Sequence, residues 1–114
     1  MRKKNYKGRC EKRNVHKCEG VCKTYDALQS RMVDILAEDE LVKEIRCNVS
    51  MDGTEYTSDI VCTMKDDSIV VYECCYRNLL KRPSNARLLQ QSREYWLKHG
   101  VKEEDWRLVV NAKK

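Results

Sequence analysis

Residues 56–76 have the sequence YTSDIVCTMKDDSIVVYECCY, and this stretch decides the fold. In both halves, apolar residues recur with the two-residue alternation that is typical of β-strands. The four residues between the halves, Lys65 to Ser68, are polar and rich in aspartate, as expected for a hairpin connection. The stretch therefore predicts two antiparallel strands joined by a short turn.

Each predicted strand carries one carboxylate, Asp59 in the first and Glu73 in the second. Asp and Glu are depleted in strands, so each needs a reason to be there. Neighbouring antiparallel strands can bring two carboxylates close enough to hold Mg²⁺ or Mn²⁺, which prefer oxygen ligands. The alternative is that both side chains point into solvent from half-exposed strands.

A chain of 114 residues has the size of one domain with one modest core. It shows no apolar run of the roughly 20 residues that span a bilayer, and its charged start does not resemble a secretory signal. We therefore expect a cytoplasmic protein without a membrane partner. The seven cysteines, an odd number, are then expected to be reduced thiols.

The positive charge is concentrated at the N-terminus. The chain has a net charge of +5, whereas residues 1–17 contain eight Lys and Arg residues and one Glu, which leaves −2 for the other 97. The N-terminal arm, residues 1–23, is therefore expected to bind nucleic-acid phosphates or to be a disordered, solubilising tail. The candidate nucleic-acid-binding residues are Arg2, Lys3, Lys4, Lys7, Arg9, Lys12 and Arg13 in the arm, and Arg77, Lys81, Arg82 and Arg87 further along.

The N-terminal arm also contains Cys10, His16, Cys18 and Cys22 within thirteen residues. Three thiolates and one imidazole can complete a tetrahedral Zn²⁺ site. The alternative is a partly ordered arm with incidental thiols, because the spacing lacks the CxxC pair of common zinc motifs. Zn²⁺ is therefore a candidate cofactor of the arm.

The second segment, residues 24–114, is expected to begin with a helix over residues 24–40. Thr24 is its predicted N-cap, and the predicted buried face consists of Leu28, Met32, Ile35 and Leu36. A strand over residues 41–49 and a hairpin signal at Asp52-Gly53 then lead into the strand of Asp59.

After the strand of Glu73, Ser84 is predicted to cap a second helix that stops at Gly100. The predicted buried side of this helix consists of Leu88, Leu89, Tyr95 and Trp96. The final strand, residues 106–111, follows a helix and should lie parallel to a neighbouring strand. The expected fold is α+β with the order αβββαβ, a mixed sheet flanked by helices.

This order, with Asp59 on the second strand and Glu73 at the end of the third, resembles the restriction-endonuclease-like core of the PD-(D/E)XK nucleases. Over residues 25–111 the chain is most similar to the N-terminal catalytic domain of the TnsA transposon endonucleases. The motifs that carry the resemblance are YTSD, VVYEC, and REYWLKHG followed by WRLVVN. The resemblance implies metal-dependent hydrolysis of DNA phosphodiesters in the cleavage of transposon or other mobile-element DNA.

In that family, an acidic residue of the first helix, a strand Asp and the Glu of a Glu-x-Lys element bind Mg²⁺ or Mn²⁺, and the Lys supplies a cation. Asp59 and Glu73 match the strand Asp and the Glu. Gln29 stands where the helix acid is expected, and Cys75 stands where the Lys is expected. Gln29 can offer an oxygen but no charge, and Cys75 offers no cation. A cation from the segment after Glu73 is the alternative source, at Arg77, Lys81 or Arg87.

Two functions of a nuclease-like fold are therefore open, and a zinc-stabilised interaction protein, in which the cysteines and His16 of the arm clamp it to the body, is a third that excludes neither. One is a DNA endonuclease with Asp59, Glu73, Gln29 and Cys75 in its active site, weakened because the lysine is a cysteine. The other is a catalytically degenerate nuclease fold that binds DNA or protein. The resemblance implies DNA and the proteins of a transposition or phage system as partners, and leaves a homodimer open.

Overall fold

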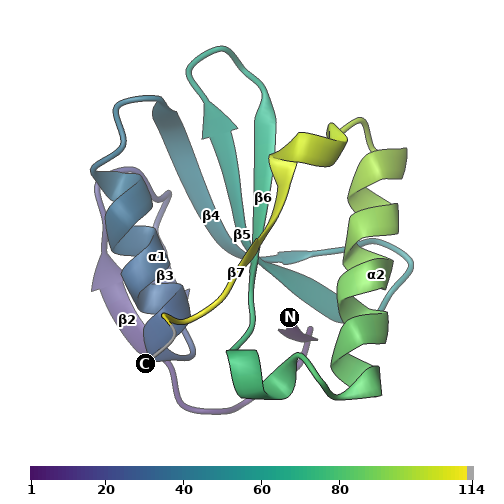
Figure 1. Cartoon of the computed structure of the whole chain (residues 1–114). Coiled ribbons are helices and arrows are strands. Elements are labelled where there is room, and N and C mark those ends of the chain that lie inside the picture. The colour runs from purple at the N-terminus through teal and green to yellow at the C-terminus, as the bar shows by residue number, and fades with distance from the viewer. Residues whose placement is uncertain (113–114) are drawn as a thin grey trace.

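The computed structural model describes residues 1–112, which form an α+β fold with a mixed sheet flanked by two helices (Figure 1). The sheet consists of β1 (Arg2–Lys3), β4 (Val42–Ser50), β5 (Tyr56–Met64), β6 (Ile69–Cys74) and β7 (Trp106–Val109). The helices are α1 (Ala27–Ala37) and α2 (Pro83–Lys98), with short 3-10 helices η1 (Arg77–Leu79) and η2 (Glu103–Asp105) before α2 and β7. No helix within residues 1–112 combines the length and apolar character needed to cross a membrane.

Strands β4, β5 and β6 form the antiparallel meander that the sequence predicts. Gly53 lies in the first turn with φ of 82°, and Asp67 lies in the second with φ of 68°. Left-handed backbone of this kind favours Gly, Asn and Asp, which is why these turns are recognisable in the sequence. Strand β7 pairs in parallel with β6, which confirms the prediction for a strand that follows a helix.

Helix α1 begins later than predicted and turns a different face to the sheet. Its N-cap is Asp26, whose carboxylate accepts a hydrogen bond from the main-chain N–H of Gln29 at 2.8 Å. The prediction of Thr24 as the cap is wrong, because Thr24 is the last residue of a strand, β3 (Val21–Thr24). The buried positions of α1 are Gln29, Val33 and Leu36, whereas Ile35 of the predicted face is 54% exposed. A polar Gln29 can occupy this face because its carboxamide is hydrogen-bonded there.

Helix α2 begins at Pro83, with Arg82 as its N-cap, so the prediction of Ser84 as the N-cap is wrong by two residues. Proline suits the first helical position because it lacks the N–H that would have no partner there. The fully buried residue of α2 is Ser92, and the predicted residues of its buried side, Leu88, Leu89, Tyr95 and Trp96, are half-buried. The most enclosed position of α2 is therefore polar.

The two helices cover opposite faces of the sheet. On one face, Val33 of α1 packs in a cluster with Ile60 of β5. On the other, Trp96 of α2 packs against Val61 and Val71. Because successive strand residues point to opposite faces, the odd-numbered positions of β5 and β6 face α2. This alternation determines the side on which Asp59 and Glu73 lie.

Residues 1–23 contain strands that the sequence does not predict. Strand β1 pairs with β5 beyond the end of β6, with Arg2 opposite Thr57. Strands β2 (Glu11–Asn14) and β3 form a separate antiparallel hairpin that lies beside α1 (Figure 1). Strand β1 is ordered by its pairing with β5, and the β2–β3 hairpin is ordered by its own pairing and by Cys22, which is buried in the core. Most of the other residues of these strands are polar, so the segments lack a strand-like apolar pattern. The alternative of a disordered tail is therefore wrong.

Candidate functional site

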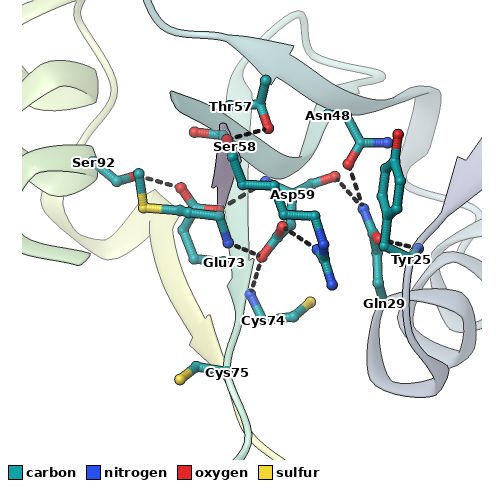
Figure 2. Close-up of polar contacts among 12 residues, drawn as sticks. Tyr25, Gln29, Asn48, Thr57, Ser58, Asp59, Glu73, Cys74, Cys75 and Ser92 are labelled. Atoms are coloured by element: carbon teal, nitrogen blue, oxygen red, sulfur yellow. Dashed lines mark hydrogen bonds and ion pairs between the residues drawn. The ribbon is translucent and has the colours of Figure 1, made fainter. Parts of the chain in front are cut away.

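Asp59 and Glu73 lie on the same face of the sheet, the one covered by α2 (Figure 2). Ile60 pairs with Tyr72, so Asp59 and Glu73 are the next opposed positions, just beyond the last paired residues. Both side chains are fully buried, which rules out the alternative that they point into solvent. The main-chain N–H of Asp59 donates to Glu73 Oε1 at 2.8 Å, and that of Cys74 donates to Asp59 Oδ2 at 2.8 Å.

Two cationic groups from the N-terminal arm contact Asp59. The amino group of Met1 lies 2.9 Å from Asp59 Oδ2, and Arg2 Nη1 lies 3.4 Å from Asp59 Oδ1. Burial alone would lower the pKa of the Met1 amino group, but the charges of Asp59 and Glu73 raise it overall. The amino group is therefore positively charged, and the carboxylate of Asp59 is compensated from both sides.

The second oxygen of Glu73 is held by helix α2 (Figure 2). The hydroxyl of Ser92 donates a hydrogen bond to Glu73 Oε2. In turn, Trp106 Nε1 donates to Ser92 Oγ at 3.0 Å. Sequence reasoning missed Ser92. The available signal was its position, since it is a small polar residue within the predicted buried side of the helix.

Glu73 is an unusual acid. Burial first, and then the charge of Asp59, raise the pKa of Glu73 to about 7, although Met1 and the hydrogen bonds from Ser92 and Asp59 oppose this rise. Buried carboxyl groups with displaced pKa values beside a charged partner are typical of functional sites. The pair formed by Asp59 and Glu73, here called the carboxylate pair, is therefore the candidate site.

We expect Ser92→Ala to lower the free energy of unfolding by about 1–3 kcal/mol, because it leaves buried polar atoms of Glu73 and Trp106 without a partner. Loss of the hydroxyl should also raise the pKa of Glu73 further. Urea unfolding at pH 7 measures the change, and Gln90→Ala, at an exposed position of the same helix, is the control. Equal losses in the two variants would contradict the role given to Ser92.

Gln29 lies beside the carboxylate pair but is fully engaged by other partners. Its Oε1 accepts a hydrogen bond from the main-chain N–H of Tyr25 at 2.8 Å. Its Nε2 donates to the main-chain oxygen of Asp59 and to Asn48 Oδ1, both at 3.0 Å. Gln29 therefore fixes the strand that carries Asp59, and the oxygen predicted as a metal ligand already serves a hydrogen bond.

Cys75 lines a cavity of about 150 Å³, together with Arg2 and Asp26. Burial raises the pKa of the Cys75 thiol, so it is neutral near pH 7. Asp26 Oδ2 lies 2.7 Å from Arg2 Nη2, which links the start of α1 to the carboxylate pair. Sequence reasoning gave Asp26 no role in the site. The spacing Asp26-x-x-Gln29 is a capping pattern, and it was the signal that this position matters.

Of the basic residues predicted to bind nucleic acid, Arg2 contacts the carboxylate pair within the described part of the chain. Arg77 donates from Nε to the main-chain oxygen of Asn111 at 2.7 Å, and Arg13 pairs with Asp34 at 2.6 Å. The exposed ones are Lys3, Lys4, Lys7, Arg9 and Lys12 in the arm, and Arg77, Lys81, Arg82 and Arg87 in η1 and around the start of α2. The structure therefore supplies a cation from the arm rather than from the segment after Glu73.

The predicted zinc ligands are only partly brought together. Cys22 Sγ lies 3.5 Å from Cys47 Sγ, and burial and Cys22 raise the pKa of Cys18 to about 12. Cys18, Cys22 and Cys47 line one groove, whereas Cys10 lines another, beside the start of α1. His16 is exposed. All seven cysteines are free thiols. Among residues 1–112, no three His, Cys, Asp or Glu side chains are grouped so that they could hold a metal ion, so the zinc and magnesium sites stay predictions.

No family model matches the sequence, and no curated protein matches it significantly. The function is therefore inferred from the geometry and chemistry of the site itself.

Proposed function

We propose that this chain is a divalent-metal-dependent DNA endonuclease of the PD-(D/E)XK type, similar to the TnsA endonucleases. The observation that carries the proposal is the placement of Asp59 and Glu73 at opposed positions of adjacent antiparallel strands, on one face of the sheet. Burying two carboxylates side by side costs free energy of folding, and such a buried pair is typical of a functional site. Binding a divalent cation is the purpose that fits two carboxylates best.

The residues present fit one Mg²⁺ or Mn²⁺ ion. The ammonium of Met1 lies 2.9 Å from Asp59 Oδ2, in a position where a metal cation could bind the same oxygen. Asp59 and Glu73 would hold the ion, which would act as a Lewis acid and lower the pKa of bound water. The main-chain N–H of Cys74 and the hydroxyl of Ser92 orient the two carboxylates for this task. The Met1 ammonium would have to leave Asp59, because the two cations would repel each other.

Cleavage of supercoiled plasmid in the presence of Mg²⁺ or Mn²⁺ tests the proposal. We expect Asp59→Asn and Glu73→Gln each to lower the rate by at least about 100-fold, because each removes a charged ligand. Glu40→Gln, at an exposed position away from the pair, is the matched control and should cut like the wild type. Equal cutting by all four proteins would mean a contaminating nuclease and would overturn the proposal.

The second candidate function is a degenerate nuclease fold that binds DNA without cutting it. It is favoured by the hydrogen bond on Gln29 Oε1 and by the neutral thiol of Cys75, since neither residue contributes charge to the site. The exposed basic residues of the arm and of α2 would then supply most of the binding energy, with strong salt dependence. Salt-sensitive retention of DNA by a wild-type chain that does not cut would support this candidate over the enzyme.

A further inference from the structure

Arg2 is fixed in place by groups other than the carboxylate pair. Its Nη2 lies 2.7 Å from Asp26 Oδ2, and its guanidinium carbon lies 4.9 Å from the centre of the Tyr25 ring. Its backbone pairs with β5, where Thr57 Oγ1 donates to the Arg2 main-chain oxygen at 3.1 Å. The contact of Nη1 with Asp59, at 3.4 Å, is much longer than the contact with Asp26. Arg2 can therefore stay in place while Nη1 donates to the oxygen of a ligand instead of Asp59.

Arg2 also lines the cavity that is lined by Cys75. The cavity has a volume of about 150 Å³, and Arg2 is the Lys or Arg residue among those that line it. The Arg2 side chain is 19% exposed, so a ligand can reach it from solvent. Cys75, on the same cavity, supplies no charge. The cation of this cavity thus comes from strand β1.

We propose that Arg2 binds the DNA phosphate that lies at the carboxylate pair. This inference rests on the proposed function, since that function brings a phosphodiester to Asp59 and Glu73. Two carboxylates repel a phosphodiester, so a cation is needed beside them to hold it and to offset the charge that develops during hydrolysis. A guanidinium can donate to Asp26 through Nη2 and to a phosphate oxygen through Nη1 at the same time, whereas a lysine ammonium is a single point charge without this fixed geometry. Asp26 and Tyr25 provide the rigid support that such a contact requires.

The test compares Arg2→Gln and Arg2→Lys with Lys65→Gln. Lys65 lies in the exposed turn between β5 and β6, so its substitution removes the same charge away from the site. Binding of a fluorescent DNA duplex is measured by anisotropy with Ca²⁺, and plasmid cleavage is measured in parallel with Mg²⁺. We expect Arg2→Gln to weaken duplex binding about tenfold and to slow cleavage at least as much, while Lys65→Gln behaves like the wild type. Arg2→Lys should fall between the two, and thermal melting checks that each variant is folded.

A second arm of the test uses the shared cavity. If Arg2 supplies the phosphate-binding cation, Cys75→Lys in the Arg2→Gln background should restore part of the binding, because it places a charge on the same cavity. Should Arg2→Gln be unfolded, Arg2→Lys alone decides, with a loss of about threefold expected. Binding by the Arg2 variants that equals or exceeds that of the wild type overturns the inference, and so does a wild-type chain that retains no duplex. A wild type that binds but does not cut ends the endonuclease proposal, while the binding comparison still judges Arg2.

Discussion

Asp59→Asn is expected to lower the free energy of unfolding by about 3–5 kcal/mol, which is a large share of the stability of a domain this size. The substitution keeps the shape of the side chain but removes the charge that compensates Met1 and Arg2. A buried cation left without its partner is much costlier than the lost attraction alone. The asparagine also offers one oxygen where the carboxylate offered two, so either the Cys74 N–H or Arg2 loses an acceptor.

Urea unfolding at pH 7 measures this loss, and Asp67→Asn is the matched control. Asp67 forms an ion pair with Lys43 at 3.3 Å, but its side chain is 80% exposed. Solvent screens such a pair, and asparagine tolerates the left-handed backbone at this turn, so the control should change stability little. Similar small changes in both variants would show that Asp59 is not the buried counter-charge described above.

Glu73→Gln is expected to stabilise the protein at pH 8, although it removes a residue of the proposed active site. The pKa of Glu73 is raised from its ordinary value of 4.5 to about 7 by burial and by Asp59, so the folded chain holds the proton more tightly than the unfolded chain. Preferential protonation of Glu73 in the folded chain therefore contributes its full stabilisation below pH 4.5. This contribution is lost as the pH rises to about 7, and it stays lost above that. A displacement from 4.5 to about 7 corresponds to roughly 3 kcal/mol at most.

The measurement is the free energy of unfolding between pH 5 and pH 8 for the wild type and for Glu73→Gln. The wild type should lose stability across this range, and the variant, which cannot ionise at this position, should not. The ordinary pKa is 8.0 for the Met1 amino group and 9.0 for the thiols of Cys18 and Cys62, and all three pKa values are raised in the folded chain. These groups therefore affect stability mainly above this window, and the range from pH 5 to pH 7 reports on Glu73. Wild-type stability that increases from pH 5 to pH 7 would contradict the raised pKa of Glu73.

The sequence predicts the centre of the fold well because the signals there are local. Alternating residues and the turns at Gly53 and Asp67 identify the meander, and the helix before Trp106 indicates a parallel last strand. The N-terminal strands escape prediction because Arg2 and Lys3 are ordered by pairing with β5, far away in sequence. The same long-range pairing explains why Arg2 was predicted only as one of many basic arm residues.

The site was predicted in part for a similar reason. Asp59 and Glu73 are recognisable because carboxylates are rare in strands, and the register of β5 and β6 brings them together. The roles of Ser92 and Asp26 depend on tertiary contacts. Ser92 reaches Glu73 only when α2 packs on the sheet, and Asp26 pairs with Arg2 only when β1 lies beside the start of α1. For Gln29, sequence position indicated the right neighbourhood but not the orientation of the carboxamide.

The pairing of β1 with β5 has a practical consequence for recombinant work. Met1 and Arg2 contact the carboxylate of Asp59. An affinity tag fused ahead of Met1 would replace the Met1 ammonium by a neutral amide and would add residues next to the paired strand β1. Such a tagged preparation is expected to differ from the untagged chain in stability, in cation affinity and in DNA cleavage. Purification handles for this protein therefore belong at the carboxyl end, or should be removed without residual residues before any assay.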